Sequence, residues 1–313
     1  GEISVSSDLC VARSLEEGRE SALEIESRGY QTVLTGGGDG TFSQMVTAVV
    51  HGCHDQGRPL PRFGLLRLGT GNALAWVLGA QKHHRGVVAD LARLRREGGH
   101  RNLRLLEVEG TLAPFAGVGV DALALRHFNE VRDVIAKIPV LGRYGRGRFS
   151  YFVAIAGRTL PEVLVRSHAH MRVINEGEDA YRVGANGQPE GPPIRRGETV
   201  FEGLARAVTF SSIPYWGFGS RIFPFADDRE DRFNLRIVNL ESMDVALHIR
   251  SIWNGTFRTP RLVDFLVDAV RIESEEILPV QIGGDAAGTS RCIHARLYPE
   301  PIAVVDFYAP PPV

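Results

Sequence analysis

The sequence predicts an α/β protein in two parts: a parallel-sheet domain at residues 1–103 and a β-rich, antiparallel, sandwich-like domain at residues 104–313. Two observations predict the first part. Extended apolar segments at residues 31–35 and 63–68 each lead into a glycine-rich loop, and a helical pattern follows each loop. A third observation predicts the second part, because short apolar runs separated by turn-rich segments replace this alternation after about residue 103.

The elements expected in the first part are strands that alternate with helices. Residues 3–5 read as a strand, and a helix is expected at about residues 9–27, with Ser7 or Asp8 as its cap. Two strand–loop–helix units follow. Alternation of this kind implies a parallel sheet with helices on its faces, and such sheets bind ligands at the carboxyl ends of their strands.

In the second part, turn-rich segments such as residues 184–193 separate the expected strands. One helix is expected within this part, at about residues 148–159. The apolar runs lie at residues 103–108, 115–120, 171–174, 207–210, 235–238, 267–272, 293–297 and 302–307.

The two glycine loops are the strongest functional signal. The first is Gly36-Gly37-Gly38-Asp39-Gly40-Thr41, and the second is Gly69-Thr70-Gly71-Asn72. Glycines let the backbone approach a ligand closely, and a helix that begins there directs N–H groups and partial positive charge at an anion. Two such loops predict a nucleotide. Neither loop is a Walker A motif, and the first does not match G-x-G-x-x-G.

Composition narrows the class of protein. A formal net charge of −1 gives no general attraction to nucleic acid. Cys10, Cys53 and Cys292 are odd in number and far apart, which argues against a disulfide framework or a zinc knuckle. No apolar run approaches the roughly 18–20 residues that span a bilayer, and no signal peptide opens the chain, so a cytoplasmic location is expected.

The two loops, in this order, resemble the diacylglycerol kinase catalytic family, which includes bacterial lipid kinases and sphingosine kinases. Weaker similarities follow in the family's order at residues 115–122, 147–152, 224–228 and 283–286. The family fold is a Rossmann-like nucleotide domain followed by a β-rich lipid-binding domain, which agrees with the division drawn above. NAD kinases share the first loop, but the second loop favours a lipid kinase.

This resemblance implies an ATP-dependent lipid kinase that transfers the γ-phosphoryl group of Mg-ATP to the hydroxyl of diacylglycerol or a sphingoid-type alcohol. Asp285 would be the catalytic base, and Asp39 would orient Mg²⁺ or the transferring phosphoryl group. Asp121 would face the lipid headgroup. The implied cofactor-binding residues are Ser7 (or Ser6), Gly37, Gly38, Asp39, Gly40, Thr41, Phe42, Ser43, Gly69, Thr70, Gly71 and Asn72, and the implied structural Mg²⁺ loop contains Asp227, Glu230 and Asp231.

Each of the less specific signals also has a plain structural interpretation. Gly283-Gly284-Asp285-Ala286 is ordinary hairpin chemistry, and the acidic loop at residues 227–231 is typical of a solvated turn. Asp121 needs no role beyond that of a turn aspartate.

Three departures from the family pattern leave a second hypothesis open. Gly283 stands at the first position of the family's D-G-E pair, with Asp285 at the second, and Gln44 stands where a glutamate usually follows the glycine loop. The family's opening strand, with its N-P-x-S-G signature, is not in this sequence. The alternative is therefore a catalytically impaired nucleotide- or lipid-binding module of the same fold.

The partner implied by the resemblance is a membrane lipid at the bilayer surface, with no nucleic acid. A homodimer is a possible assembly. Peripheral contact with the inner face of the membrane accompanies the expected cytoplasmic location. Arg143, Arg146 and Arg148 are the residues expected to meet anionic headgroups.

Overall fold

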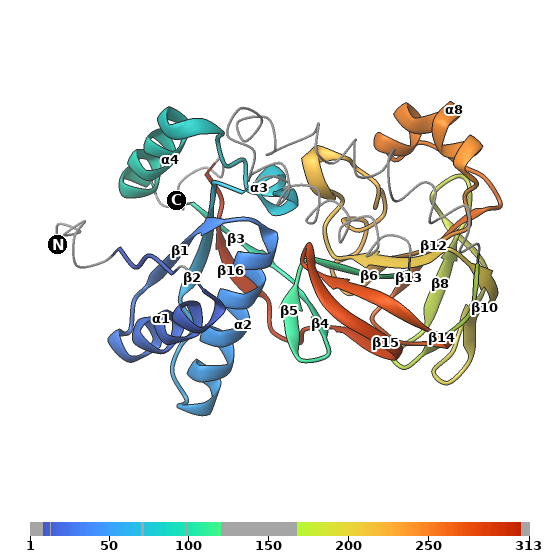
Figure 1. Cartoon of the computed structure of the whole chain (residues 1–313), viewed down its shortest axis with the longest axis horizontal. Coiled ribbons are helices and arrows are strands. Elements are labelled where there is room, and N and C mark those ends of the chain that lie inside the picture. Colours follow the sequence, from blue (N-terminus) through green and yellow to red (C-terminus); the bar gives the residue numbers. More distant parts are fainter. Residues whose placement is uncertain (1–8, 13, 70–71, 98, 120–167, 308–313) are drawn as a thin grey trace.

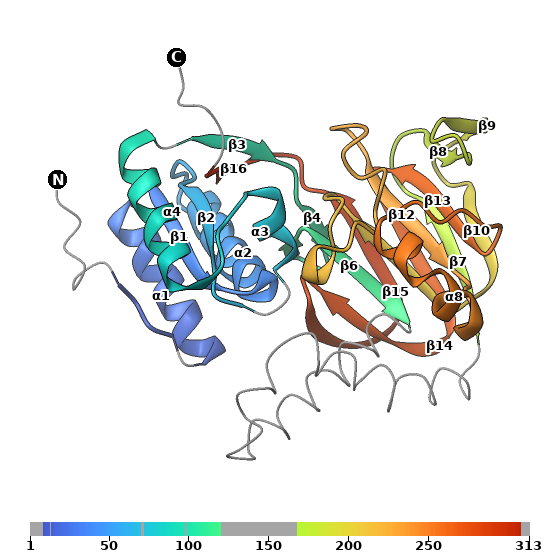
Figure 2. The same ribbon diagram turned by 90° about the horizontal axis from the view of Figure 1, so that it is seen from above.

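In the computed structural model the chain folds as the α/β protein that the sequence predicts, with a small parallel sheet followed by a large antiparallel sheet. Figures 1 and 2 show the small sheet with its helices at one end of the molecule and the large sheet at the other. The structure describes residues 9–12, 14–69, 72–97, 99–119 and 168–307. The strand expected at residues 3–5, the helix expected at 148–159 and the three arginines at 143–148 lie outside these residues.

The small sheet has four strands in the order β1-β2-β16-β3. Strands β1, β2 and β16 run parallel, and β3 is antiparallel to β16. The strands are β1 (Thr32–Gly37), β2 (Arg62–Arg67), β3 (His100–Leu103) and β16 (Ile302–Val305), and the helices of this half are α1 (Leu15–Arg28), α2 (Asp39–Asp55), α3 (Ala73–Val77) and α4 (His83–Glu97).

The position of β16 corrects the boundary predicted from the sequence. The sequence pattern places the apolar run at residues 302–307 in the second domain, but its strand lies between β2 and β3 in the first sheet. Ile302 and Val304 are fully buried there. A short apolar run has the same pattern in a buried parallel strand and in an antiparallel core strand, so periodicity could not separate the two.

Helix α2 positions the first glycine loop, and its apolar spacing explains how it packs. Phe42, Val46, Val49, Val50 and Cys53 recur along one face and are buried. Its N-cap is Gly38, in an extended conformation directly after β1. The helix therefore begins at the carboxyl edge of the sheet.

The large sheet is one hydrogen-bonded network of twelve strands. Its main order is β5-β4-β15-β14-β6-β11-β12-β13-β8-β9, and β7 joins β10 to β14. The strands are β4 (Leu106–Val108), β5 (Thr111–Ala113), β6 (Phe115–Gly119), β7 (Ala169–Asn175), β8 (Ala180–Val183), β9 (Pro189–Ile194), β10 (Thr199–Ala205), β11 (Ala207–Ser211), β12 (Phe233–Val238), β13 (Leu262–Val267), β14 (Ala269–Ile282) and β15 (Asp285–Leu297), with helices η2 (Gly217–Gly219) and α8 (Ser242–Trp253) between strands.

The two halves share apolar packing. Leu112, Phe115, Ile213 and Phe223 come from the second half, yet they belong to the core cluster of the small sheet. The Leu112 N–H also donates to the Thr47 hydroxyl on α2, at 2.8 Å. This contact joins β5 to α2. Figure 1 shows the tip of the β14–β15 hairpin beside the end at which α2 begins.

None of the helices within the described ranges combines the length and apolar character needed to cross a bilayer.

Candidate active site at the two glycine loops

The two glycine loops touch through their backbones. The Gly69 N–H donates to the Gly37 carbonyl at 2.8 Å. A Cβ atom on residue 69 would lie 2.5 Å from the Cα of Gly38 and 2.7 Å from its nitrogen. Only glycine fits at residue 69, because these neighbours are backbone atoms that cannot turn aside.

Alanine at residue 69 is therefore expected to lower the free energy of unfolding by about 1–3 kcal/mol, the usual cost of overpacking. Urea unfolding checks this value. Gly18 is the matched control, because a Cβ there meets only the Cβ of Ala12 at 4.0 Å within helix α1. Gly18→Ala should leave stability unchanged or raise it by up to about 1 kcal/mol. Equal effects of the two substitutions would contradict the contact.

Asp39 holds the second loop from the first. Its Oδ2 accepts the N–H of Ala73 at 2.7 Å, and its Oδ1 accepts the N–H of Leu74 at 2.9 Å. These amides open helix α3, whose own N-cap, Asn72, provides no side-chain cap. Asp39 is only 7% exposed. One buried carboxylate thus caps a helix thirty-four residues further along the chain.

Burial raises the pKa of Asp39 to about 6, because it disfavours the charged carboxylate. The two amide hydrogen bonds lower the pKa but do not outweigh burial. The negative charge of Asp285 raises it further, and the positive charge of Arg67 lowers it. Asp39 therefore responds to charges on both sides of the site.

The beginning of α2 provides backbone donors beside this carboxylate. The Phe42 N–H makes the first helical bond, to the Gly38 carbonyl at 3.1 Å. The amides of Asp39, Gly40 and Thr41 precede it, and these are amides that an α-helix leaves without an acceptor of its own. With the helix dipole they suit an anion such as phosphate.

The tip of the β14–β15 hairpin approaches the same helix end. Gly283 and Gly284 form a two-residue turn with φ values of +59° and +87°, and Ile282 pairs with Asp285 across it. Such a turn favours glycine. The Gly283 N–H donates to the Phe115 carbonyl at 2.8 Å, and a Cβ atom there would overlap the Ser43 hydroxyl. The positive φ and the shift that Ser43 would have to make both disfavour, at position 283, the acidic side chain that the family pattern suggests.

Asp285 lies where the two halves meet. Its carboxylate lies against Gly40, on which a Cβ atom would overlap it, and the Gln44 amide donates to its Oδ2 at 3.3 Å. Asp285 is exposed, in contrast to the buried Asp39. Gln44 therefore contacts the carboxylate, where a glutamate would bring a second negative charge.

The structure gathers most of the predicted nucleotide residues but gives them different environments. The Phe42 side chain is fully buried in the core, and the Ser43 hydroxyl donates to the Asp39 carbonyl at 2.9 Å. Asn72 has φ of +43° and donates to the Gly69 carbonyl at 2.9 Å. Its Oδ1 is buried and has no hydrogen-bond partner among the described residues. Gly37, Gly38, Asp39, Gly40, Thr41 and Gly69 form the loops, and Ser7, Thr70, Gly71 and Asp121 lie outside the described residues.

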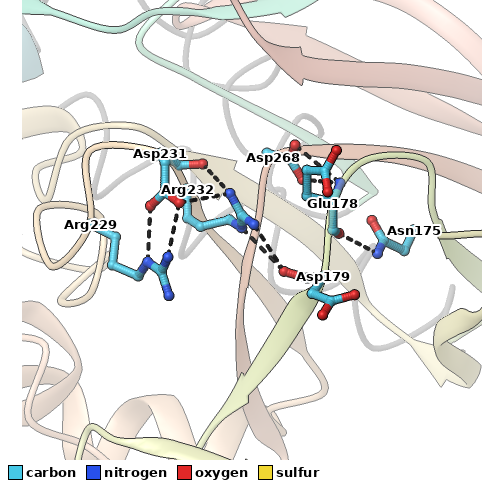
Figure 3. Close-up of polar contacts among 7 residues, drawn as sticks. All are labelled: Asn175, Glu178, Asp179, Arg229, Asp231, Arg232 and Asp268. Atoms are coloured by element: carbon cyan, nitrogen blue, oxygen red, sulfur yellow. Dashed lines mark hydrogen bonds and ion pairs between the residues drawn. The ribbon is translucent and has the colours of Figure 1, made fainter. Parts of the chain in front are cut away.

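Arginines are the partners of the acidic loop predicted to hold a metal. Asp231 accepts hydrogen bonds from Arg229 at 2.9 Å and from Arg232 at 3.0 Å, as Figure 3 shows. Asp227 pairs with Arg221 at 3.4 Å, and Glu230 is exposed. Within the described ranges, no group of three or more His, Cys, Asp or Glu side chains is arranged to hold a metal ion. The metal role of Asp227, Glu230 and Asp231 stays a prediction.

Arg67 and Trp76 are further candidate residues that the sequence motifs do not indicate. The Arg67 guanidinium carbon lies 4.6 Å from the centre of the Trp76 ring, and the Lys82 ammonium lies 5.6 Å from it. The signal in the sequence is an arginine at the end of a strand, two residues before the second glycine loop.

Comparisons with known proteins agree with this arrangement. Residues 3–106 match the model of the diacylglycerol kinase catalytic domain. A crystal structure of a diacylglycerol kinase from Bacillus anthracis str. Sterne is similar over 94% of this chain and 83% of its own, with a TM-score of 0.59 and 12% identity. Another crystal structure from that organism has a TM-score of 0.62 at 14% identity, covering 94% of this chain and 84% of its own. No curated protein matches the sequence.

Proposed function

From the premise that residues 3–106 belong to the diacylglycerol kinase catalytic domain family, we propose that this protein is an ATP-dependent lipid kinase. It transfers the γ-phosphoryl group of ATP to the hydroxyl of a membrane lipid, either diacylglycerol or a sphingoid-type alcohol. The observation that carries this proposal is the exposed Asp285 carboxylate, held against Gly40 at the start of α2.

The glycine loops bind the nucleotide in this proposal. Phosphoryl transfer depends on positioning and on stabilising charge over the phosphate oxygens. The amides of Asp39, Gly40 and Thr41 point charge of the right sign at those oxygens. Asp39 keeps the two loops together by holding the N-terminal amides of α3. Its function here is to preserve the shape of the binding surface.

Asp285 acts as the general base. A base must reach the hydroxyl proton, and an exposed carboxylate at the meeting point of the two halves satisfies this requirement. The acceptor lipid approaches from the β-rich half. Its hydroxyl gives its proton to Asp285 as its oxygen bonds to the γ-phosphorus, and ADP leaves with the electrons of the broken P–O bond.

The chemistry of the site fits Mg²⁺ together with ATP. Magnesium is usually held by one or two carboxylates and by substrate phosphates, and Asp39 and Asp285 are close enough for one to raise the pKa of the other. When bound, Mg²⁺ neutralises charge on the phosphates.

The impaired-module hypothesis rests on Gly283 and Gln44. The tight turn and the adjacent Ser43 explain why residue 283 is glycine, because a side chain there would overlap the Ser43 hydroxyl. The missing carboxylate at 283 therefore does not by itself favour loss of catalysis. A bilayer partner, a homodimer and peripheral contact with the inner face of the membrane belong to the same proposal.

The test incubates the protein with radiolabelled ATP and mixed micelles that contain diacylglycerol, a sphingoid alcohol or neither lipid. We expect label in one of the lipids, with Asp285→Asn as the matched control. If neither lipid gains label above that control, the kinase proposal fails. Retained ATP binding in that case would favour the impaired module.

A further inference from the structure

Arg67 lies at the edge of the sheet where the nucleotide is proposed to bind. It is the last residue of β2 and pairs in register with Gly37, the last residue of β1. Gly69 of the second loop follows two residues later. The backbone of Arg67 therefore lies beside the first glycine loop and just before the second, and Figure 1 shows β1 and β2 side by side.

An aromatic ring holds the Arg67 guanidinium. The guanidinium carbon lies 4.6 Å from the centre of the Trp76 indole, within the range of a cation–π contact. The indole is itself fixed. A Cβ atom on Gly219 would lie 2.5 Å from it, and Tyr215 stacks on it at 6.3 Å and 28°. Trp76 remains 40% exposed, so this is a surface ring in contact with solvent.

The positive charge of Arg67 affects Asp39 in the proposed site. It lowers the pKa of Asp39, which the charge of Asp285 raises. The same buried carboxylate thus interacts with the proposed base and with the arginine. The guanidinium therefore belongs to a strand end beside the first glycine loop, and its charge reaches the carboxylate that holds the two loops together. Planar guanidinium groups bind phosphate oxygens through two parallel hydrogen bonds.

We propose that Arg67, positioned by Trp76, binds the β- and γ-phosphates of the nucleotide. This inference rests on the proposed function, because it takes the glycine loops as the nucleotide site. Trp76 is a positioning residue that holds the guanidinium through the cation–π contact. Lys82, whose ammonium lies 5.6 Å from the same ring, adds positive charge nearby.

The test measures the dissociation constants of ATP and AMP by competition against a fluorescent nucleotide. Arg67→Ala is expected to weaken ATP binding about tenfold or more, the cost of losing a charge-assisted phosphate contact, and AMP binding less than about threefold. It should also reduce the dependence of ATP affinity on salt. Arg67→Lys and Trp76→Leu should give intermediate losses for ATP.

Arg62→Ala is the matched control. Arg62 is half-buried like Arg67 and belongs to the same strand, but it lies at the amino end, away from the loops. It should leave ATP and AMP binding unchanged, and circular dichroism should show that each variant is folded.

Equal losses for ATP and AMP, or an Arg67→Ala variant that binds ATP as tightly as Arg62→Ala does, would overturn the inference. Wild-type protein that binds ATP through Arg67 but labels no lipid would end the kinase proposal and leave this inference in place.

Discussion

Asp285→Asn is expected to lower kcat for lipid phosphorylation by about 10²–10⁴-fold, the usual contribution of a general base. Asparagine keeps the shape of the side chain and can still accept a hydrogen bond from Gln44, which contacts Asp285 at 3.3 Å. It cannot accept the hydroxyl proton. The KM for ATP should change little, because the loop amides and not this side chain would hold the phosphates. Steady-state kinetics with varied ATP and varied lipid separate these effects.

Glu276→Gln is the matched control for this substitution. Glu276 is an exposed carboxylate on β14, the other strand of the same hairpin. Its replacement should leave kcat unchanged. Asp285→Asn should lower the free energy of unfolding by no more than about 1 kcal/mol, because it removes a negative charge near the N-terminus of α2. A variant that keeps full kcat would show that Asp285 is an ordinary turn residue.

Asp39→Asn is expected to lower kcat/KM for ATP by about tenfold or more, because leaving a buried polar group unsatisfied costs about 1–3 kcal/mol. An asparagine has one acceptor oxygen, whereas both carboxylate oxygens of Asp39 accept amides of α3. The asparagine NH₂ group would face one of those amides, donor against donor. The second glycine loop should then separate from the first.

The raised pKa of Asp39 also predicts how pH acts. Between about pH 4 and pH 6 the folded state keeps a proton that the unfolded chain has released, so the free energy of unfolding falls as pH rises through this window. The fall is about 3 kcal/mol for a pKa raised from 3.8 to about 6. Asp39→Asn should remove this dependence. Because the same group titrates in the active protein, kcat/KM of the wild type should fall as pH drops below about 6.

Asp55→Asn provides the comparison, because Asp55 is an exposed carboxylate at the opposite end of α2. The free energy of unfolding in urea and kcat/KM for ATP are measured for each variant at about pH 4.5, 6 and 7.5, which span the titration of Asp39. If Asp39→Asn and Asp55→Asn show the same pH dependence as the wild type, the proposed role of Asp39 is wrong.

The division into a parallel-sheet half and an antiparallel half could be predicted, because it follows from local pattern. The glycine content of Gly37–Thr41 and of the segment that begins at Gly69 predicts the two loops. The spacing of the apolar residues in α2 predicts its buried face. What the sequence could not predict depends on distant contacts. The capping of α3 by Asp39 joins residues 34 positions apart, and the contact of Gln44 with Asp285 joins residues 241 apart.

Gly283 illustrates the limit most clearly. Comparison with the family pattern suggests that an acidic residue has been replaced by glycine at this position. Its positive φ and the adjacent Ser43 show a turn that favours glycine. No pattern within the hairpin reveals that Ser43, from another part of the chain, fills the space in which a side chain would lie.

The place of β16 in the small sheet has a consequence for how the two halves depend on each other. The order β1-β2-β16-β3 connects β3 to β2 only through a strand that the chain supplies near residue 305. The segment at residues 3–106 that carries the family match thus lacks one strand of the sheet to which it belongs. During synthesis its sheet cannot close until almost all of the β-rich half has been made, so formation of the proposed nucleotide site is coupled to completion of the β-rich half.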